Sequence, residues 1–149
     1  SNLEILTKLN ETESWFEAMK VGAVWARENT ESTVISSLEG DTKAEAGEII
    51  CRGPDGDTWV QEAEKFAAKY QPTNDSPDDG FQKYIPIPEH SKVMAAKVAE
   101  PFQISTHRGI LHGQADDYLL KSIEDKHTDF PESIWIVAEN IFATTYKPV

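Results

Sequence analysis

Short runs of hydrophobic residues, several of them mixed with polar positions, recur along this chain and predict a protein built mainly of short β-strands. Residues 33–37 and 103–106 mix β-branched and polar side chains, which is typical of half-exposed strands. Residues 49–51 and 118–120 are continuous apolar runs, so we expect strands that are buried on both faces. Further strands are predicted at residues 20–26, 58–60, 93–99 and 134–137.

Two segments have the periodicity of short helices. Phe66 and Tyr70 stand four residues apart, as do Phe142 and Tyr146, and this spacing places both rings of each pair on one helical face. A proline follows each segment and ends it. We therefore predict helices over residues 62–70 and 139–146, and a third helix with an apolar face near the N-terminus, over residues 3–16.

The strongest pattern is an internal repeat. Residues 35–40 reappear as residues 104–109, and without a gap residues 46–52 then match residues 115–121. A longer polar loop, residues 122–133, follows in the second copy. Beyond it the same residue types return in the same order, as the pairs Trp59 and Trp135, Phe66 and Phe142, Tyr70 and Tyr146, and Pro72 and Pro148.

The repeat predicts an α+β fold that is rich in short antiparallel strands. We expect one compact domain over residues 1–149, with repeats at 20–72 and 92–148, each ending in a short helix. Residues 73–91 are predicted to link the two, and residues 3–19 form an N-terminal helical segment. Upstream of the clear matches, residues 20–23 are aligned with residues 92–95.

A unit of about 50 to 60 residues buries little core by itself. We therefore expect the two copies to pair around an approximate twofold axis, as a pseudo-dimer within a monomeric chain. A homodimer of the whole chain is left open.

Charge and composition exclude some partners. The formal net charge is −12, spread over both halves of the chain, and a field of this sign repels nucleic-acid phosphates. No apolar run is long enough to cross a bilayer, and no signal peptide is visible. The single cysteine, Cys51, cannot form an internal disulfide and lies in an apolar run that predicts a buried, inert thiol. We expect a cytoplasmic protein that binds neither nucleic acid nor membrane.

Few residues suggest chemistry. His107, His112 and Asp116 lie close in sequence and are weak candidates for a metal site. The first copy has Leu38 and Lys43 where the second has these histidines, so the group is not part of the repeated unit. The chain has no phosphate-binding loop, nucleophile elbow or Cys-x-x-Cys pair, and we predict no catalytic residue, no metal and no cofactor.

The recurring aromatic residues have two interpretations. Trp59 and Trp135 precede matched helices and are most simply core residues that join helix to sheet. The alternative is an aromatic binding site, for which Trp59, Trp135 and Tyr118 are the candidates.

The repeated unit resembles the PGDYG-motif family of small phage and mobile-element proteins. The first copy carries the matching residues at Leu38-Glu39-Gly40, Gly47-Glu48, Gly56-Asp57, Trp59, Phe66 and Tyr70. The second carries them at Gly109, Asp117-Tyr118, Trp135, Phe142 and Tyr146. The proline of the motif is replaced by Ala46 and Ala115, and two copies in one chain differ from the single-copy form. The resemblance implies a fold and assigns no catalytic residue.

Three functions follow as hypotheses. The first is a non-enzymatic binding or interaction module, an accessory protein of phage or mobile-element type that has a protein partner. The second is an enzyme or small-ligand-binding protein with a pocket between the two copies, which a pocket lined with polar groups from both copies would favour. The third is an acidic decoy that binds a basic host protein.

Overall fold

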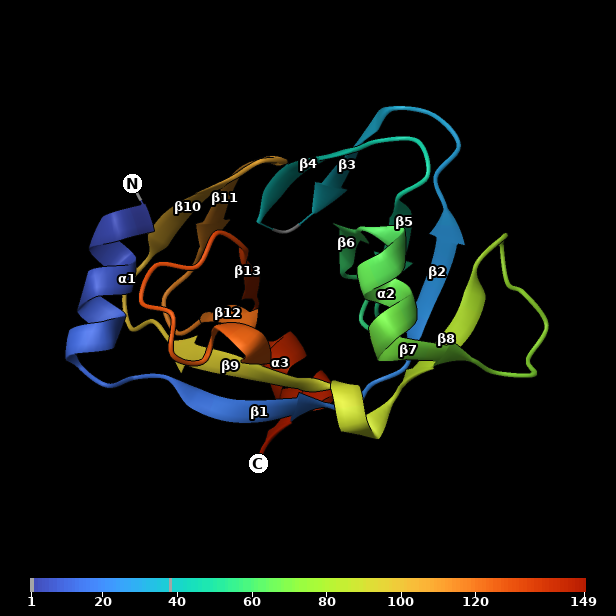
Figure 1. Cartoon of the computed structure of the whole chain (residues 1–149). Coiled ribbons are helices and arrows are strands. Elements are labelled where there is room, and N and C mark those ends of the chain that lie inside the picture. The colour runs from blue at the N-terminus through green and yellow to red at the C-terminus, as the bar shows by residue number, and fades with distance from the viewer. Residues whose placement is uncertain (1, 38) are drawn as a thin grey trace.

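The computed structural model describes residues 2–37 and 39–149. It is an α+β fold, rich in antiparallel strands (Figure 1). No helix in the described part of the chain is long and apolar enough to cross a membrane. Leu38, which the sequence places in the first copy, lies outside the described residues.

Two five-stranded antiparallel sheets form the body of the molecule. One has the strand order β6-β5-β2-β8-β7 and the other has the order β13-β12-β9-β1-β14. The strands of the first sheet are β2 (Val24–Glu28), β5 (Ile49–Arg52), β6 (Thr58–Gln61), β7 (Tyr70–Pro72) and β8 (Gln82–Pro86). The strands of the second are β1 (Phe16–Lys20), β9 (Lys92–Lys97), β12 (Tyr118–Ser122), β13 (Ile134–Val137) and β14 (Tyr146–Pro148).

Two hairpins lie at the top of the view in Figure 1. They consist of β3 (Thr33–Ser37) with β4 (Gly40–Ala44), and of β10 (Phe102–Thr106) with β11 (Gly109–Gly113). Two backbone hydrogen bonds join the two hairpins: the N–H of Lys43 donates to the carbonyl of Arg108 at 3.1 Å, and the N–H of His112 donates to that of Glu39 at 2.7 Å. The hairpins therefore bridge the two halves of the molecule.

Both sheets are buried on both faces near their centres, as the apolar runs predict. Ile50 and Cys51 are neighbours in β5 and belong to different hydrophobic clusters, and Leu119 and Leu120 of β12 do the same. Cys51 is fully buried, and burial raises the pKa of its thiol to about 12. Its burial confirms the expectation for this residue, and the raised pKa keeps the thiol protonated near neutral pH.

The helices that follow β6 and β13 confirm the two short helices predicted from the spacing of Phe and Tyr. They are α2 (Ala63–Lys69) and α3 (Glu139–Thr145). Phe66 stacks on Tyr70 with ring centroids 4.7 Å apart, and Phe142 stacks on Tyr146 at 5.0 Å. Each tyrosine is the C-cap of its helix and the first residue of the next strand, so the ring pair ties helix to sheet.

The N-terminal segment differs from the prediction. Its helix, α1 (Asn2–Glu11), ends earlier, and β1 begins at Phe16. Leu6 and Leu9 are buried against the second sheet, whereas Leu3 is 58% exposed. A helix over residues 3–19 would have removed β1 from that sheet, where it pairs with both β9 and β14.

Two other predicted boundaries also need correction. Residues 20–26 are not one strand, because residues 21–23 separate β1 from β2. Residues 73–91 are not only a linker: they contain β8 and the 3-10 turn η1 (Pro88–His90). β8 pairs with β2 and β7, so part of the predicted linker completes the first sheet.

Candidate functional site

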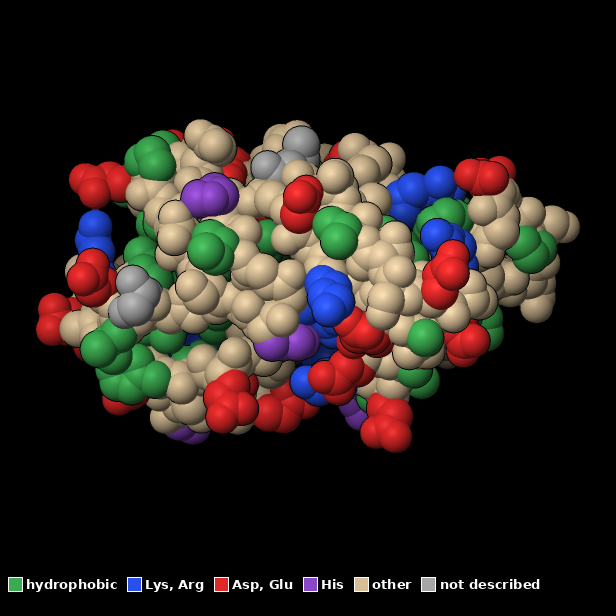
Figure 2. All heavy atoms as spheres, turned by 90° about the horizontal axis from the view of Figure 1, so that it is seen from above, with side chains coloured by type: hydrophobic (Ala, Val, Ile, Leu, Met, Phe, Trp, Pro, Cys, Tyr) green, Lys and Arg blue, Asp and Glu red, His purple; other side chains and the backbone are tan. Residues whose placement is uncertain are grey.

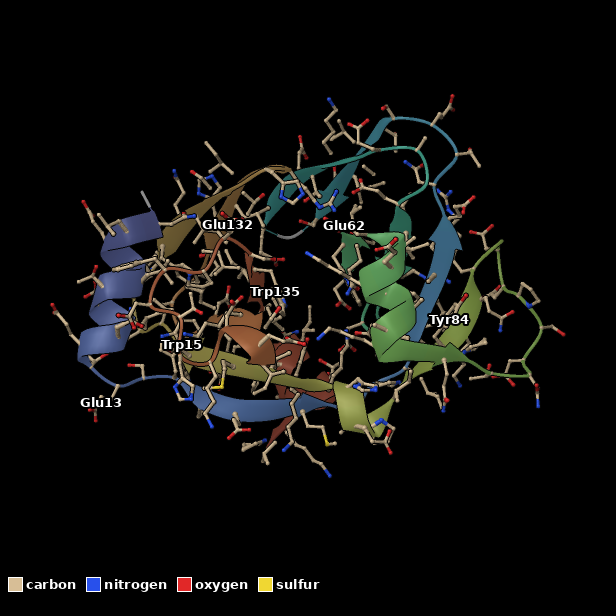
Figure 3. All side chains as sticks on the ribbon, in the orientation of Figure 1. Glu13, Trp15, Glu62, Tyr84, Glu132 and Trp135 are labelled. Carbon is tan, nitrogen blue, oxygen red and sulfur yellow. The ribbon has the colours of Figure 1, made fainter. Side chains whose placement is uncertain are left out.

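A cleft of about 240 Å³ lies between the two sheets, below the hairpins. β6 and α2 form one side of it, and β13 and α3 form the other. Glu62 and Trp135, labelled in Figure 3, come from these opposite sides. Hairpin residues, among them Ser37, Glu39 and Thr106, complete the lining. The cleft therefore exists only because both sheets and both hairpins are present.

Trp59 and Trp135 line this cleft, one from each sheet. Both are partly buried and pack against hydrophobic clusters, Trp59 beside Phe66 and Tyr70 and Trp135 beside Phe142 and Tyr146, so each indole has one side on the core and another on the cleft. The neighbouring Val60 and Ile136 also line the cleft and are more fully buried, at 8% and 6% exposed. Because adjacent residues of a strand point to opposite faces, Trp59 and Val60 contact different hydrophobic clusters, as do Trp135 and Ile136.

Lys20, the last residue of β1, places a positive charge among three aromatic rings of the cleft. Its Nζ lies 4.1 Å from the ring centroid of Trp59 and 5.4 and 5.6 Å from those of Tyr70 and Tyr146. No carboxylate of the described residues lies within salt-bridge distance of it. The three rings supply the attraction that an anion would otherwise provide.

Glu39 is the most perturbed carboxylic acid of the cleft. Burial raises its pKa to about 7, with further contributions from the negative charges of Asp117 and Asp57. Burial also raises the pKa of Asp57, another lining residue. Glu39 can therefore exchange a proton near neutral pH and donate a hydrogen bond when it is protonated.

Arg108 holds one edge of the cleft in place. Its Nη1 donates to Oε1 of Glu48 at 2.7 Å, and the two side chains are only 13% and 17% exposed. The same nitrogen reaches the carbonyl oxygen of Lys43 at 3.4 Å. The hydrogen bond from Arg108 holds the pKa of Glu48 below its usual range. This ion pair fastens the hairpin of the second half to the first half.

Tyr118 is not part of the cleft. Its ring stacks on that of Phe142 with centroids 3.9 Å apart and meets Phe16 edge to face at 6.3 Å. These contacts place Tyr118 in the hydrophobic cluster between the second sheet and α3. Of the three candidate binding residues, the structure brings together Trp59 and Trp135 and separates Tyr118 from them.

The weak metal candidates do not converge. His107 lines the cleft, while His112 borders a shallow groove on the outer side of the two hairpins. Figure 2 shows this hairpin face, where acidic, basic and histidine side chains lie close together near the middle. Asp116 occupies a turn with a φ of 73°. Within residues 2–37 and 39–149, no three histidine, cysteine or carboxylate side chains are placed to hold a metal.

Sequence reasoning missed Lys20 and Glu39. A lysine at the end of a strand looks like an ordinary solvated charge, and Glu39 occupies a turn between two hairpin strands. Only the tertiary structure places Lys20 beside three aromatic rings and buries Glu39 near two other carboxylates. The chain matches no family model, no curated protein and no solved structure.

Proposed function

We propose that this chain is a non-enzymatic binding protein whose site for a small molecule is the cleft between the two sheets. The observation that carries the proposal is that the partly exposed indoles of Trp59 and Trp135 line one cleft from opposite sheets. Indole rings supply large, rigid contact surface, and a concave site with a few polar groups among apolar walls is the usual form of a small-molecule site.

We also infer that the chain is a duplicated unit with an approximate twofold axis through the cleft. The two sheets support this, because their orders coincide when β2, β5, β6, β7 and β8 are matched with β9, β12, β13, β14 and β1. In this match Ala26 and Ala95 are equivalent, because they pair with Cys51 and Leu120, respectively. The sequence alignment of residues 20–23 with 92–95 would instead match Ala26 with Val98, so it is shifted by three residues from the match of the sheets.

The duplicated units exchange a strand. β1 directly precedes β2 in sequence but lies in the sheet of β9, and β8 directly precedes β9 but lies in the sheet of β2. Each sheet therefore takes its fourth strand from the other unit. The exchange supports the pseudo-dimer, because neither unit completes a sheet from its own residues.

The resemblance to the PGDYG-motif family, an accessory role in a phage or mobile element and a cytoplasmic location remain part of this proposal. They rest on the motifs of the repeated unit and on composition. In this proposal the ligand binds between the two copies of one chain. A single-copy member of that family could form an equivalent site between the two subunits of a homodimer.

The proposal is tested by following the four indole N–H signals in a two-dimensional NMR spectrum while small ring-containing compounds are added. Trp59 and Trp135 line the cleft, whereas Trp15 and Trp25 do not and serve as internal controls. Binders should shift the first two signals and leave the others in place. A broad set of such compounds that shifts neither cleft signal, or shifts only the controls, would contradict the proposal.

A further inference from the structure

The two walls of the cleft differ in chemistry although they are built from matched elements. On the side of β6 and α2 the lining residues are Gln61, Glu62, Lys65 and Lys69. At the corresponding positions of β13 and α3, each 76 residues further along the chain, they are Val137, Ala138, Ile141 and Thr145. One wall is thus charged and the other is largely apolar. A ligand that fits both walls has an apolar face and a polar face.

Lys20 is one of four basic residues that line the cleft, with Lys65, Lys69 and Arg108, and it has no matched lysine in the first sheet. Lys20 pairs with Tyr146 in the second sheet, and the residue that pairs with Tyr70 in the first sheet is Pro86. The lysine Nζ is nearly equidistant from the two tyrosine rings, at 5.4 and 5.6 Å. The exchanged strand therefore delivers one ammonium group between the two tyrosine rings, and the matched position of the first sheet holds Pro86 in place of a cation.

Lys20 makes no ion pair with a described carboxylate, although its charge offsets part of the rise that burial causes in the pKa of Asp57, which also lines the cleft. The protein has a net charge of −12, yet no described carboxylate lies within 4.0 Å of this nitrogen. The face of Trp59 that lies under Nζ is covered by the lysine, which leaves Trp135 and the apolar wall as the free surface for a ring. An anionic group beside Nζ and a ring on Trp135 would satisfy both features at once.

From these contacts we infer that the ligand is a small cyclic organic anion, with its ring against Trp135 and the apolar wall and its anionic group on Lys20. This inference rests on the proposed function of the cleft and adds the chemical class of the ligand. The ring gains apolar burial on Ile141 and Val137, while a carboxylate or phosphate gains a charge-assisted hydrogen bond that a neutral or cationic group cannot form.

The test is a titration of the full chain with benzoate, phenyl phosphate, benzyl alcohol and benzylamine, followed by the indole signals of Trp59 and Trp135. We expect the anions to bind at least about 10-fold more tightly than the alcohol and the amine, a difference of about 1.4 kcal/mol. Comparing benzoate with phenyl phosphate identifies which anionic group the site prefers.

Lys20→Gln should remove this preference, and Lys20→Arg should retain part of it. Lys92→Gln is the matched control, since Lys92 is an exposed residue of the neighbouring strand β9 and does not line the cleft. Equal binding of all four probes, or an anion preference that survives Lys20→Gln, would overturn the inference about the ligand class and leave the binding cleft intact. If none of the probes shifts the cleft signals, both the class and the site are contradicted.

Discussion

Gly40 and Gly109 approach the opposite hairpin in the same way. Their φ angles are 140° and 139°, and a Cβ atom built on Gly40 would lie 2.9 Å from the carbonyl oxygen of Ile110, while one built on Gly109 would lie 2.9 Å from that of Asp41. Gly40 and Gly109 are 69 residues apart, and so are Asp41 and Ile110, so each glycine contacts the residue that follows the other glycine. The hairpins can meet this closely because both positions lack a side chain.

Gly40→Ala and Gly109→Ala should therefore destabilise the fold equally, by about 2–3 kcal/mol each, because both substitutions combine an unfavourable φ with a clash against backbone. Gly47→Ala is the control: its φ is 89°, but nothing lies within 4 Å of the added Cβ. It should cost only about 1 kcal/mol. Urea unfolding measures all three, and a cost for Gly40→Ala no larger than that of the control would contradict the close contact.

The ion pair between Arg108 and Glu48 should stabilise the junction of the two halves. Arg108→Gln leaves the carboxylate partly buried without its partner, so we expect a loss of about 2–3 kcal/mol at neutral pH. Because Arg108 lowers the pKa of Glu48, the pair contributes above the ordinary pKa of a glutamate and is lost as the pH falls through the lowered one.

The difference in unfolding free energy between Arg108→Gln and the parent should therefore shrink in acid. Lys43→Gln, which removes the exposed ion pair of Lys43 with Glu45, should change stability little at any pH. An Arg108→Gln variant as stable as the parent at neutral pH would show that the pair is not needed at the junction.

Glu39 should make stability depend on pH in the opposite sense. Its pKa is raised to about 7 in the folded protein, from an ordinary value of 4.5, so folding favours the protonated acid. The contribution is fully present below the ordinary pKa and is lost as the pH rises through about 7.

Glu39→Gln should remove this loss, so that the variant gains stability relative to the parent between about pH 5 and pH 8. Glu31→Gln, at an exposed position, should run parallel to the parent. Thermal melts of the three proteins across this range provide the measurement. Parallel curves for the parent and Glu39→Gln would refute the raised pKa.

The tryptophans of the cleft and the phenylalanines of the helices should differ in their contribution to stability. Phe66 and Phe142 are 4% and 5% exposed, and replacing either with alanine should cost about 3–5 kcal/mol. Trp59→Ala and Trp135→Ala should cost less, about 1–2 kcal/mol, because part of each indole is already exposed. Chemical denaturation ranks the four variants. Tryptophan variants as unstable as the phenylalanine variants would contradict the prediction and show that the indoles stabilise the core as much as the phenylalanines do.

Much of the secondary structure could be predicted from local patterns, whereas the cleft could not. Apolar runs identified the doubly buried β5 and β12, and the Phe-Tyr spacing identified α2 and α3. β8 was missed because Gln82, Lys83 and Pro86 look like linker residues, and its partners β2 and β7 are determined by tertiary pairing. Periodicity shows that Trp59 and Val60 face opposite sides of a strand, but it does not show which of the two is the more fully buried.

The exchanged strands lead to a prediction for the separate halves. A fragment of residues 1–78 lacks β8 and has no sheet to receive β1, and a fragment of residues 79–149 lacks β1 and has no sheet to receive β8. Each fragment alone should be unfolded or self-associated, while a mixture of the two should form a 1:1 complex with the spectrum of the intact chain. Size-exclusion chromatography with NMR decides the question, and a well-folded monomeric fragment would contradict the exchange.

The position of β1 also affects how the chain folds during synthesis. The sheet that contains β8 has all its strands once Pro86 has left the ribosome, but β1, made much earlier, has to wait for β9 and for β14 at Tyr146–Pro148. The edge of β1 that pairs with β14 is thus without its final partner until Tyr146–Pro148 has been translated, whereas the other edge can pair once β9 has left the ribosome. During that interval, β1 of one nascent chain can pair with β9 or β14 of another before that chain's own β1 does, so neighbouring ribosomes on one message offer a route to interlinked chains.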